Sequence, residues 1–279
     1  MSAVAEAIQE GRIGGRLWMY ANYHCNLTCA YCLTESAPAV ARRLLSPERM
    51  TALAAEARAA GFTALGVTGG EPFLVPGLAG TLAAMAAELP TLVLSNGTLF
   101  TRRLLAQLEP LAGADLAVQI SLDSAEPEAN DAMRGPENFA KVVDAIPRLR
   151  ALGIRVRIAT TTEGIEGDAL ARLCELHRSL DVPDDDHVLR PVVRRGRAVD
   201  HGMGVDATLA DLPAELTITA DGAFWSPFGP TVHGGRLDTD LLITRTTRPL
   251  SVPAGAMLKI AGAAGADDTA PGRSELKIC

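Results

Sequence analysis

Aromatic residues and positive charge are both scarce in this sequence. Phe, Trp and Tyr make up 4% of the 279 residues, and 26 Lys and Arg face 33 Asp and Glu, giving a formal net charge of −7 at pH 7. A negatively charged chain repels polyanions, whereas non-specific nucleic-acid binding needs a basic surface. The composition therefore argues against a nucleic-acid partner.

Long apolar runs and cysteines are few as well. No run approaches the ~20 apolar residues needed to span a bilayer, and residues 1–15 lack the apolar segment of a secretory signal. We therefore expect a cytoplasmic protein with no membrane partner. Three of the five cysteines lie close together, which in a reducing compartment predicts metal ligands rather than a disulfide framework.

Strands and helices alternate from residue 16 to residue 205. Ser46 and Pro47, for example, are typical of the start of a helix and Gly61 of its end. Such alternation predicts right-handed βαβ units around a parallel sheet. About six units predict an α/β fold, a partial (β/α)6 TIM-like barrel that falls short of the eight units of a closed one. The expected strands are Arg16–Tyr23, Ala64–Thr68, Thr91–Ser95, Leu116–Leu122, Ile154–Thr160 and Val188–Val193.

The pattern changes near residue 206. Residues 206–260 contain short strands, such as Leu216–Thr219 and Leu241–Thr244, which predict a small β-rich C-terminal extension. Residues 1–15 are expected to form an N-terminal extension. Residues 261–279 are rich in Ala, Gly and Asp, which predicts a flexible tail.

Cys25, Cys29 and Cys32 supply three thiolates from the loop that follows the first strand. A [4Fe–4S] cluster usually has four cysteine ligands, so three leave one iron with an open position for a cofactor or substrate. The spacing resembles the motif of the radical S-adenosylmethionine (SAM) superfamily, which has an aromatic residue before the last cysteine, here Tyr31. A zinc site completed by His24 and an electron-carrying iron–sulfur protein are the alternatives.

The resemblance implies two cofactors, one [4Fe–4S] cluster and SAM. It implies that SAM chelates the open iron, and that an electron from the cluster cleaves SAM to a 5′-deoxyadenosyl radical, which abstracts hydrogen from a substrate. The expected partners are a small-molecule or peptide substrate in a biosynthetic pathway and an external one-electron donor such as flavodoxin or ferredoxin. RNA or peptide modification and a non-catalytic iron–sulfur sensor are the alternative functions.

Further segments resemble the SAM-binding segments of the superfamily, between residues 17 and 197. The "GGEP" motif implies that its backbone and the Glu71 carboxylate receive the SAM ammonium. The "SNG" and "SLD" motifs lie near SAM in the family, and the latter contacts the ribose hydroxyls or the methionine. For Asp123 an ordinary turn or helix-cap role is the alternative. The matching residues are Gly69, Gly70, Glu71, Pro72, Ser95, Asn96, Ser121 and Asp123, and the segment Arg134-Gly135 continues the resemblance.

The extension resembles the hairpin of the group that contains the molybdopterin cyclase and the SPASM/twitch enzymes. In that group the hairpin carries cysteines for auxiliary clusters, whereas Ser226 and Pro227 stand where a ligand is expected. Cys174 and Cys279 are the cysteines left outside the three-cysteine motif, too few for a second cubane. We therefore expect a degenerate extension and a single cluster.

Substrate-binding residues are predicted after the sixth strand. Arg190, Arg194, Arg195 and Arg197 would clamp a phosphate or carboxylate there, and a solvated basic loop is the alternative. Cys279 is a candidate hydrogen donor to the substrate radical, with an irrelevant tail thiol as the alternative. Cys174 and His177 share a helix face, which indicates a ligand pair or, alternatively, a buried thiol beside a surface imidazole.

Overall fold

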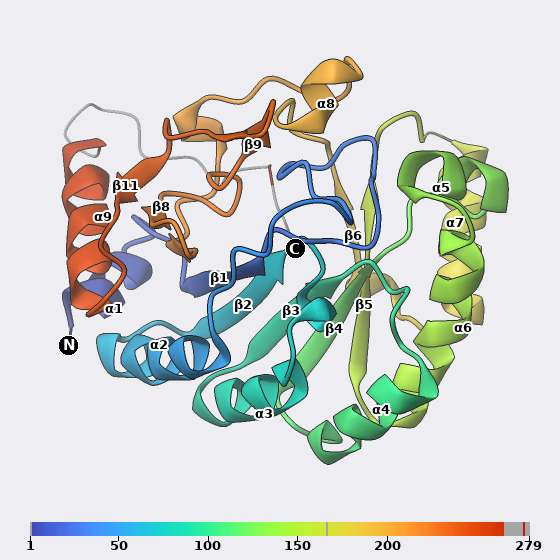
Figure 1. The fold of residues 1–279 in the computed structure, drawn as a ribbon, viewed down its shortest axis with the longest axis horizontal. Helices are drawn as coiled ribbons and strands as arrows, with labels where there is room; N and C mark the ends of the chain where they lie inside the picture. The colour runs from blue at the N-terminus through green and yellow to red at the C-terminus, as the bar shows by residue number, and fades with distance from the viewer. Residues whose placement is uncertain (1, 166, 265–275, 277–279) are drawn as a thin grey trace.

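Six parallel strands form the centre of the computed structural model, which describes residues 2–165, 167–264 and 276 (Figure 1). They pair in chain order from β1 to β6, and each neighbouring pair is parallel. This arrangement confirms the predicted α/β partial barrel. The strands are β1 (Arg16–Asn22), β2 (Ala64–Gly69), β3 (Thr91–Ser95), β4 (Leu116–Ser121), β5 (Arg155–Thr161) and β6 (His187–Arg190).

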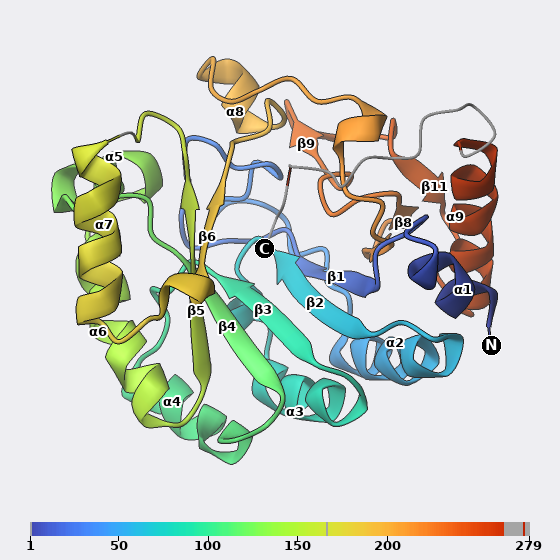
Figure 2. The same cartoon turned by 180° about the vertical axis from the view of Figure 1, so that it is seen from behind.

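Helices cover the outside of the curved sheet (Figure 2). The main ones are α2 (Pro47–Ala60), α3 (Leu78–Glu88), α4 (Arg102–Leu108), α6 (Asn138–Ala151) and α7 (Asp168–Ser179). Two further helices, α5 (Pro127–Arg134) and α8 (Arg197–Asp200), were not predicted. None of the described helices is both long and apolar enough to cross a membrane.

Helix α2 shows why the sequence forms these elements. The Ser46 side chain accepts a hydrogen bond from the Arg49 N–H, which satisfies a free donor of the first turn. Gly61 ends the helix with a φ of 97°, a left-handed conformation that favours glycine. Its buried residues Met50, Leu53, Ala54 and Ala57 recur at helical spacing and pack in the core that the helices form with the sheet.

The C-terminal extension continues the barrel sheet. Strand β7 (Thr217–Ile218) pairs in parallel with β1, and β8 (Ala223–Phe224) and β11 (Leu242–Thr244) follow in antiparallel order. A separate hairpin is formed by β9 (Val232–His233) and β10 (Arg236–Leu237). The predicted β-rich extension is thus present, and it lies against β1 as part of one sheet.

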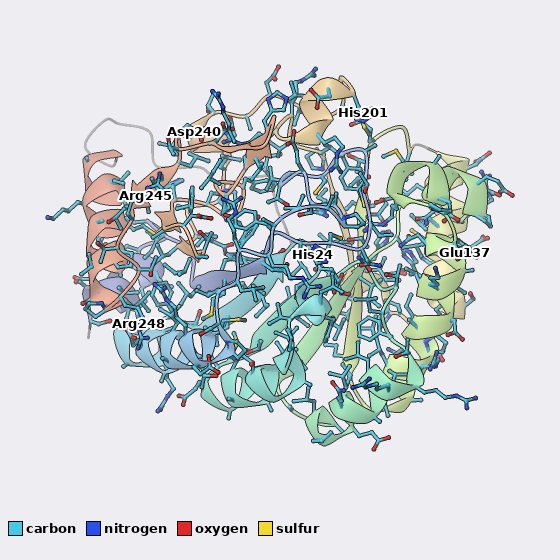
Figure 3. The ribbon with its side chains drawn as sticks, in the orientation of Figure 1. His24, Glu137, His201, Asp240, Arg245 and Arg248 are labelled. Carbon is cyan, nitrogen blue, oxygen red and sulfur yellow. The ribbon has the colours of Figure 1, made fainter. Side chains whose placement is uncertain are left out.

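A helix that was not predicted follows the strands of the extension. Helix α9 (Ser251–Ala264) contacts β11 and α1 (Ala3–Gln9). Nearby, Glu56 of α2 accepts a hydrogen bond from the Leu250 N–H at 2.6 Å and lies 3.7 Å from Arg248, which Figure 3 labels. Residues 261–264 of the predicted tail are therefore helical, and residues 265–275 and 277–279 lie outside the described part of the chain.

Candidate active site

A pocket of about 990 Å³, including its part open to solvent, lies at the carboxyl ends of the barrel strands. Its walls come from the cysteine loop, the loops after the strands and the extension. Predicted residues that line it are Cys25, Cys29, Tyr31, Cys32, Gly69, Gly70, Ser95, Asn96, Ser121 and Arg190; residues that were not predicted as site residues include Tyr20, Thr68, Arg134, Thr161, Val192 and Phe228.

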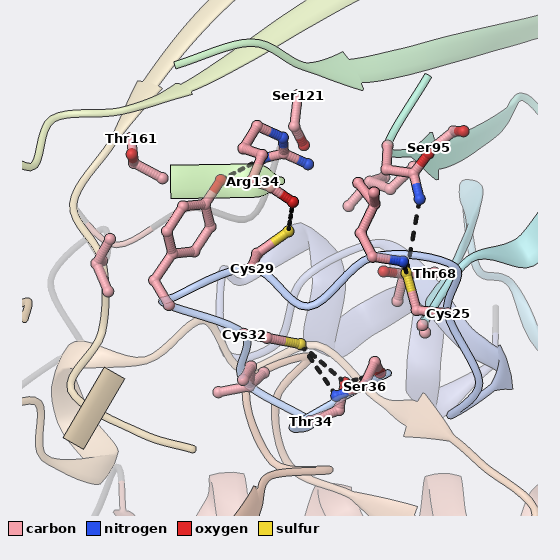
Figure 4. A pocket seen from close by; sticks show the side chains of 18 of the residues that line it. Cys25, Cys29, Cys32, Thr34, Ser36, Thr68, Ser95, Ser121, Arg134 and Thr161 are labelled. Carbon is pink, nitrogen blue, oxygen red and sulfur yellow. Dashed lines mark hydrogen bonds between the residues drawn. The ribbon is translucent and has the colours of Figure 1, made fainter. Parts of the chain in front are cut away.

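The three cysteine side chains stand on different sides of one space in this pocket (Figure 4). Cys25 Sγ accepts hydrogen bonds from the Leu27 N–H at 3.4 Å and the Asn96 amide at 3.5 Å. Cys32 Sγ accepts one from the Ser36 N–H at 3.3 Å. Such donors stabilise sulfur in its charged form, whereas burial, the largest effect, raises the pKa of the Cys25 thiol to about 12. A coordinated metal deprotonates a thiol outright, so these sulfurs suit metal binding.

The spacing of the thiols distinguishes a cluster from a single metal ion. Tetrahedral zinc, with Zn–S bonds of about 2.3 Å, needs sulfurs about 3.8 Å apart. In the described part of the chain the one group with three ligand atoms within 4.8 Å of one another is Glu35, Asp200 and His233, outside this pocket. His24, the zinc ligand considered above, has Nδ1 3.3 Å from the Val40 carbonyl oxygen. The three cysteines do not form such a group, so at least two of their Sγ atoms lie more than 4.8 Å apart. This separation exceeds what one zinc ion needs and fits a cubane better.

The glycines after β2 allow the cysteine loop to pass close by. The Gly70 N–H donates to the Asn22 carbonyl at 3.0 Å, and the Glu71 N–H donates to the His24 carbonyl at 2.9 Å. A Cβ on Gly69 would lie 2.3 Å from the Asn22 oxygen, and one on Gly70 would lie 2.2 Å from the His24 oxygen. Any side chain here would push the cysteine loop away.

The Glu71 carboxylate points away from the pocket and towards the loop after β3. The side chain is fully buried, and its oxygens accept hydrogen bonds from the N–H groups of Phe73 at 3.1 Å and Asn96 at 2.8 Å and from the Ser95 hydroxyl at 3.0 Å. Burial raises its pKa to about 7, against the opposing effect of these donors. Glu71 therefore holds the Asn96 loop, and Pro72 begins the short 3-10 turn behind it.

Beside the cysteines, the half-buried Tyr31 forms a polar cluster with the buried Asp123 and Arg134. Asp123 and Arg134 are paired at 3.1 Å, and the Tyr31 hydroxyl donates to Asp123 and accepts from Arg134. The other oxygen of Asp123 accepts from the Thr161 N–H at 2.9 Å. Burial raises the pKa of Tyr31 well above its usual value, so the phenol stays protonated. The cluster joins the cysteine loop to β4 and β5, and Asp123 itself does not line the pocket.

The four arginines after β6 are not brought together. Arg190 lines the pocket. Arg194 pairs with Asp206 at 3.2 Å, and Arg195 binds both carboxylate oxygens of Asp240 at 2.8 and 2.7 Å. Arg197 donates to backbone carbonyls of the cysteine loop. The predicted clamp is thus reduced to Arg190, because the other guanidinium groups are bound by this chain itself.

Comparison with known proteins identifies the family. The model of the Radical SAM superfamily matches residues 19–197. The chain belongs to the radical SAM superfamily. It is therefore an enzyme, and its cofactors are a [4Fe–4S] cluster and SAM, which excludes the sensor alternative. The three cysteines are the residues that would hold the cluster, as the predicted motif implied.

Curated radical SAM relatives cover parts of the chain. It is 33% identical over 230 residues to the GTP 3′,8-cyclase of Chlorobaculum tepidum, covering 76% of this chain and 66% of the relative. It is 34% identical over 139 residues to the antilisterial bacteriocin subtilosin biosynthesis protein AlbA of Bacillus subtilis, covering 49% of this chain and 31% of AlbA. The chain thus spans less than two thirds of the length of these relatives.

Solved structures share the radical SAM fold. Native anSMEcpe with bound AdoMet matches with a TM-score of 0.60 at 14% identity, covering 86% of this chain and 80% of that one. Streptococcus suis SuiB bound to precursor peptide SuiA matches with a TM-score of 0.60 at 15% identity, covering 75% of this chain and 46% of SuiB. At these identities the likeness concerns the fold alone.

Two cysteines, Cys174 and Cys279, lie outside the radical SAM motif. Cys279 lies outside the described residues. Cys174 is half-buried, with Sγ 3.9 Å from His187 Nδ1. His177 was expected at the surface, but it is 1% exposed, and neither of its ring nitrogens has a hydrogen-bond partner in the described structure. The expectation was wrong because α7 turns this face towards β6, where the rings of His177 and His187 meet edge to face, with centroids 4.2 Å apart.

Proposed function

We propose that this enzyme binds SAM beside its three cysteines and abstracts hydrogen from a small molecule or short peptide that carries one anionic group. The observation that carries the proposal is the position of Arg190, which lines the same pocket as the cysteines. When bound there, the cluster and SAM would supply an electron and a carbon-centred radical. The protein's own task is to orient the substrate and to exclude water.

Arg190 is suited to bind an anion. Its Nε atom is buried and has no hydrogen-bond partner among the described residues. The side chain as a whole is half-buried, and a buried N–H group that lacks a partner is unfavourable, so a ligand anion would stabilise it. A guanidinium group binds carboxylate or phosphate through two parallel hydrogen bonds, which also fixes the orientation of the ligand.

The charge balance of the pocket limits the size of that anion. Arg134, the second arginine that lines the pocket, already pairs with Asp123, and the whole chain carries a net charge of −7. Among the residues that the structure describes, Arg190 is the pocket arginine without a carboxylate partner, and its charge matches one carboxylate or one phosphate group. A nucleoside triphosphate such as GTP, the substrate named for the cyclase relatives, would keep most of its charge uncompensated.

The remaining walls favour an apolar body attached to this anion. Leu33, Val192 and Phe228 line the pocket, and Phe228 comes from the extension. Tyr20 adds a ring whose hydroxyl donates to the Pro227 carbonyl at 2.6 Å and is thereby held in place. Apolar walls exclude water, which protects a reactive radical from side reactions.

The class of reaction is tested with anaerobically reconstituted protein. We expect about four irons and four sulfides per chain, as one cubane requires, and slow release of 5′-deoxyadenosine when dithionite and SAM are added. Reduced flavodoxin or ferredoxin should replace dithionite as the electron donor. One tightly bound zinc, or no 5′-deoxyadenosine, would contradict the proposal.

The role of Arg190 is tested with Arg190→Gln and the control Arg194→Gln, which removes a cation outside the pocket. Candidate substrates with one carboxylate or one phosphate, short peptides and GTP are screened for faster release of 5′-deoxyadenosine. We expect Arg190→Gln to abolish the stimulation by the anionic substrate, with unchanged SAM affinity, and Arg194→Gln to keep it. Weaker SAM binding by Arg190→Gln would instead assign Arg190 to the SAM carboxylate, and stimulation by GTP alone would contradict the charge argument.

A further inference from the structure

We propose that Arg197 is a positioning residue for the iron–sulfur cluster, and that it couples the C-terminal extension to the cysteine loop. The inference concerns the cluster of the superfamily and does not depend on which substrate the enzyme uses. It rests on contacts between the segment Arg195–Arg197, the cysteine loop (residues 25–36) and the extension.

Arg197 binds the cysteine loop at three carbonyl oxygens. Its backbone N–H donates to Cys32 at 3.0 Å, Nη1 donates to Cys29 at 2.6 Å, and Nη2 donates to Ser36 at 3.0 Å. Two of these carbonyls belong to cluster ligands. The side chain of Arg197 thus sets the distance between Cys29 and Ser36, and its backbone holds Cys32, so this one residue contacts two of the three cysteines.

Gly196 allows this close approach. Its φ is +58°, and a Cβ at this position would lie 2.2 Å from the Leu33 carbonyl oxygen and 2.6 Å from that of Cys32. These are contacts with backbone atoms, which have no flexible end that can move aside. The segment thus packs directly on the backbone of the cysteine loop. It separates Cys29 and Cys32 on one side from the extension on the other.

The extension holds the other side of the same segment. Arg195 forms a two-pronged ion pair with Asp240, which Figure 3 labels, and donates to the Thr231 hydroxyl at 2.8 Å. The extension also touches the loop itself, since the Val232 N–H donates to the Leu33 carbonyl at 3.1 Å. The extension, which lacks cysteines of its own, thereby holds the cysteine loop of the barrel in place.

The Arg197 guanidinium also acts through its charge. Reduction of the cluster adds one negative charge, and a nearby cation stabilises the reduced form more than the oxidised form. Arg197 should therefore make the cluster easier to reduce, in addition to fixing its ligands.

Two substitutions separate the charge of Arg197 from its geometry. Arg197→Gln removes the cation, and Arg197→Lys keeps it but loses the two-pronged contact with Cys29 and Ser36. We expect Arg197→Gln to lower the equilibrium constant for reduction about tenfold, which is about 59 mV for a one-electron couple, measured by EPR-monitored redox titration. Arg197→Lys should keep the potential but lose iron faster to a chelator. Arg194→Gln, the same change in charge three residues earlier, should match the wild type in both measurements.

A variant of the extension tests the coupling. Asp240→Asn removes the charge of the Asp240 partner of Arg195 and leaves Arg197 in place, so iron loss should accelerate while the potential stays that of the wild type. Hydrogen exchange of the metal-free chain should be faster at residues 25–36 in Arg197→Gln and Asp240→Asn than in Arg194→Gln, at an equal melting temperature. An unchanged potential in Arg197→Gln overturns the charge effect. If both Arg197→Gln and Asp240→Asn show wild-type hydrogen exchange and iron retention, the proposal that the extension positions the cysteine loop through this segment is overturned.

Discussion

The backbone N–H of Asn96 donates to the Glu71 carboxylate at 2.8 Å, and the Asn96 side-chain amide donates to Cys25 Sγ at 3.5 Å. One residue thus links the carboxylate of the β2 loop to the first cluster thiol. Glu71 acts on the site through this loop, although it does not face the pocket.

Replacing Glu71 should therefore weaken SAM binding indirectly. Glu71→Ala removes the acceptor of three hydrogen bonds, and the loop that carries Ser95 and Asn96 loses its support. We expect the dissociation constant for SAM to rise by tenfold or more, since a buried donor that loses its acceptor costs about 1–3 kcal/mol, while the three cysteines still retain iron. SAM binding and iron content measured on the same sample check this. Unchanged SAM affinity would refute the indirect role.

Gly70 should tolerate no side chain. Gly70→Ala places a Cβ 2.2 Å from the His24 carbonyl oxygen, so the cysteine loop must shift and cluster assembly should fail. Gly80→Ala in α3 is the control, since a Cβ there meets nothing within 4 Å and should stabilise the helix by about 0.5–1 kcal/mol. Iron content and melting temperature report the two effects. Normal iron content in Gly70→Ala would contradict the packing argument.

Asp123 should be needed for the fold around the site. Asp123→Asn leaves Arg134 as a buried cation without its partner, which destabilises a protein by about 3–5 kcal/mol. The control is Asp144→Asn, which breaks an exposed pair with Arg148 within one helix and should change stability by less than about 0.5 kcal/mol. Urea unfolding of the metal-free chain measures both, and similar losses in the two variants would argue against the buried pair.

His177 should make the protein sensitive to acid. Burial lowers the pKa of His177 to about 3 from an ordinary value of 6.5, so the unfolded chain takes up a proton that the folded chain excludes. Its contribution to stability is complete above pH 6.5 and is lost as the pH falls towards 3.

His177→Leu should remove this loss. It should also stabilise the chain by about 1–3 kcal/mol at pH 7, because buried ring nitrogens with no hydrogen-bond partner are eliminated. Unfolding by urea at pH 5 and pH 8 tests both effects, with the exposed His201→Gln as the control. A variant that keeps the acid sensitivity of the wild type would show that another group causes it.

The barrel was predictable because its six strands and main helices have local signals. The cap at Ser46, the end at Gly61 and the apolar strands report short-range preferences, and the order of parallel strands follows from their connection through helices. Helix α9 escaped prediction because its Ala- and Gly-rich sequence resembles a tail, and its stability comes from packing on β11 and α1. Likewise, the parallel pairing of β7 with β1 joins residues far apart in the sequence.

The site was predictable in its composition but not in its contacts. The motif placed the cysteines, glycines and Ser95 at the pocket, as their spacing in the loops required. Which arginine faces the pocket depends on where Asp206 and Asp240 lie, and these partners come from the extension. Sequence spacing cannot report that competition, since it is decided by tertiary contacts.

The pairing of β1 with β7 also delays the completion of the sheet during synthesis. Trp18 in β1 pairs with Thr217 in β7, so during synthesis the first strand keeps one open edge until residue 217 has left the ribosome. Open strand edges invite pairing with other chains. Over the same interval the cysteine loop lacks the cover that Val232 supplies at Leu33. The nascent chain is therefore most prone to aggregation during the period in which its cysteines are most accessible to iron delivery.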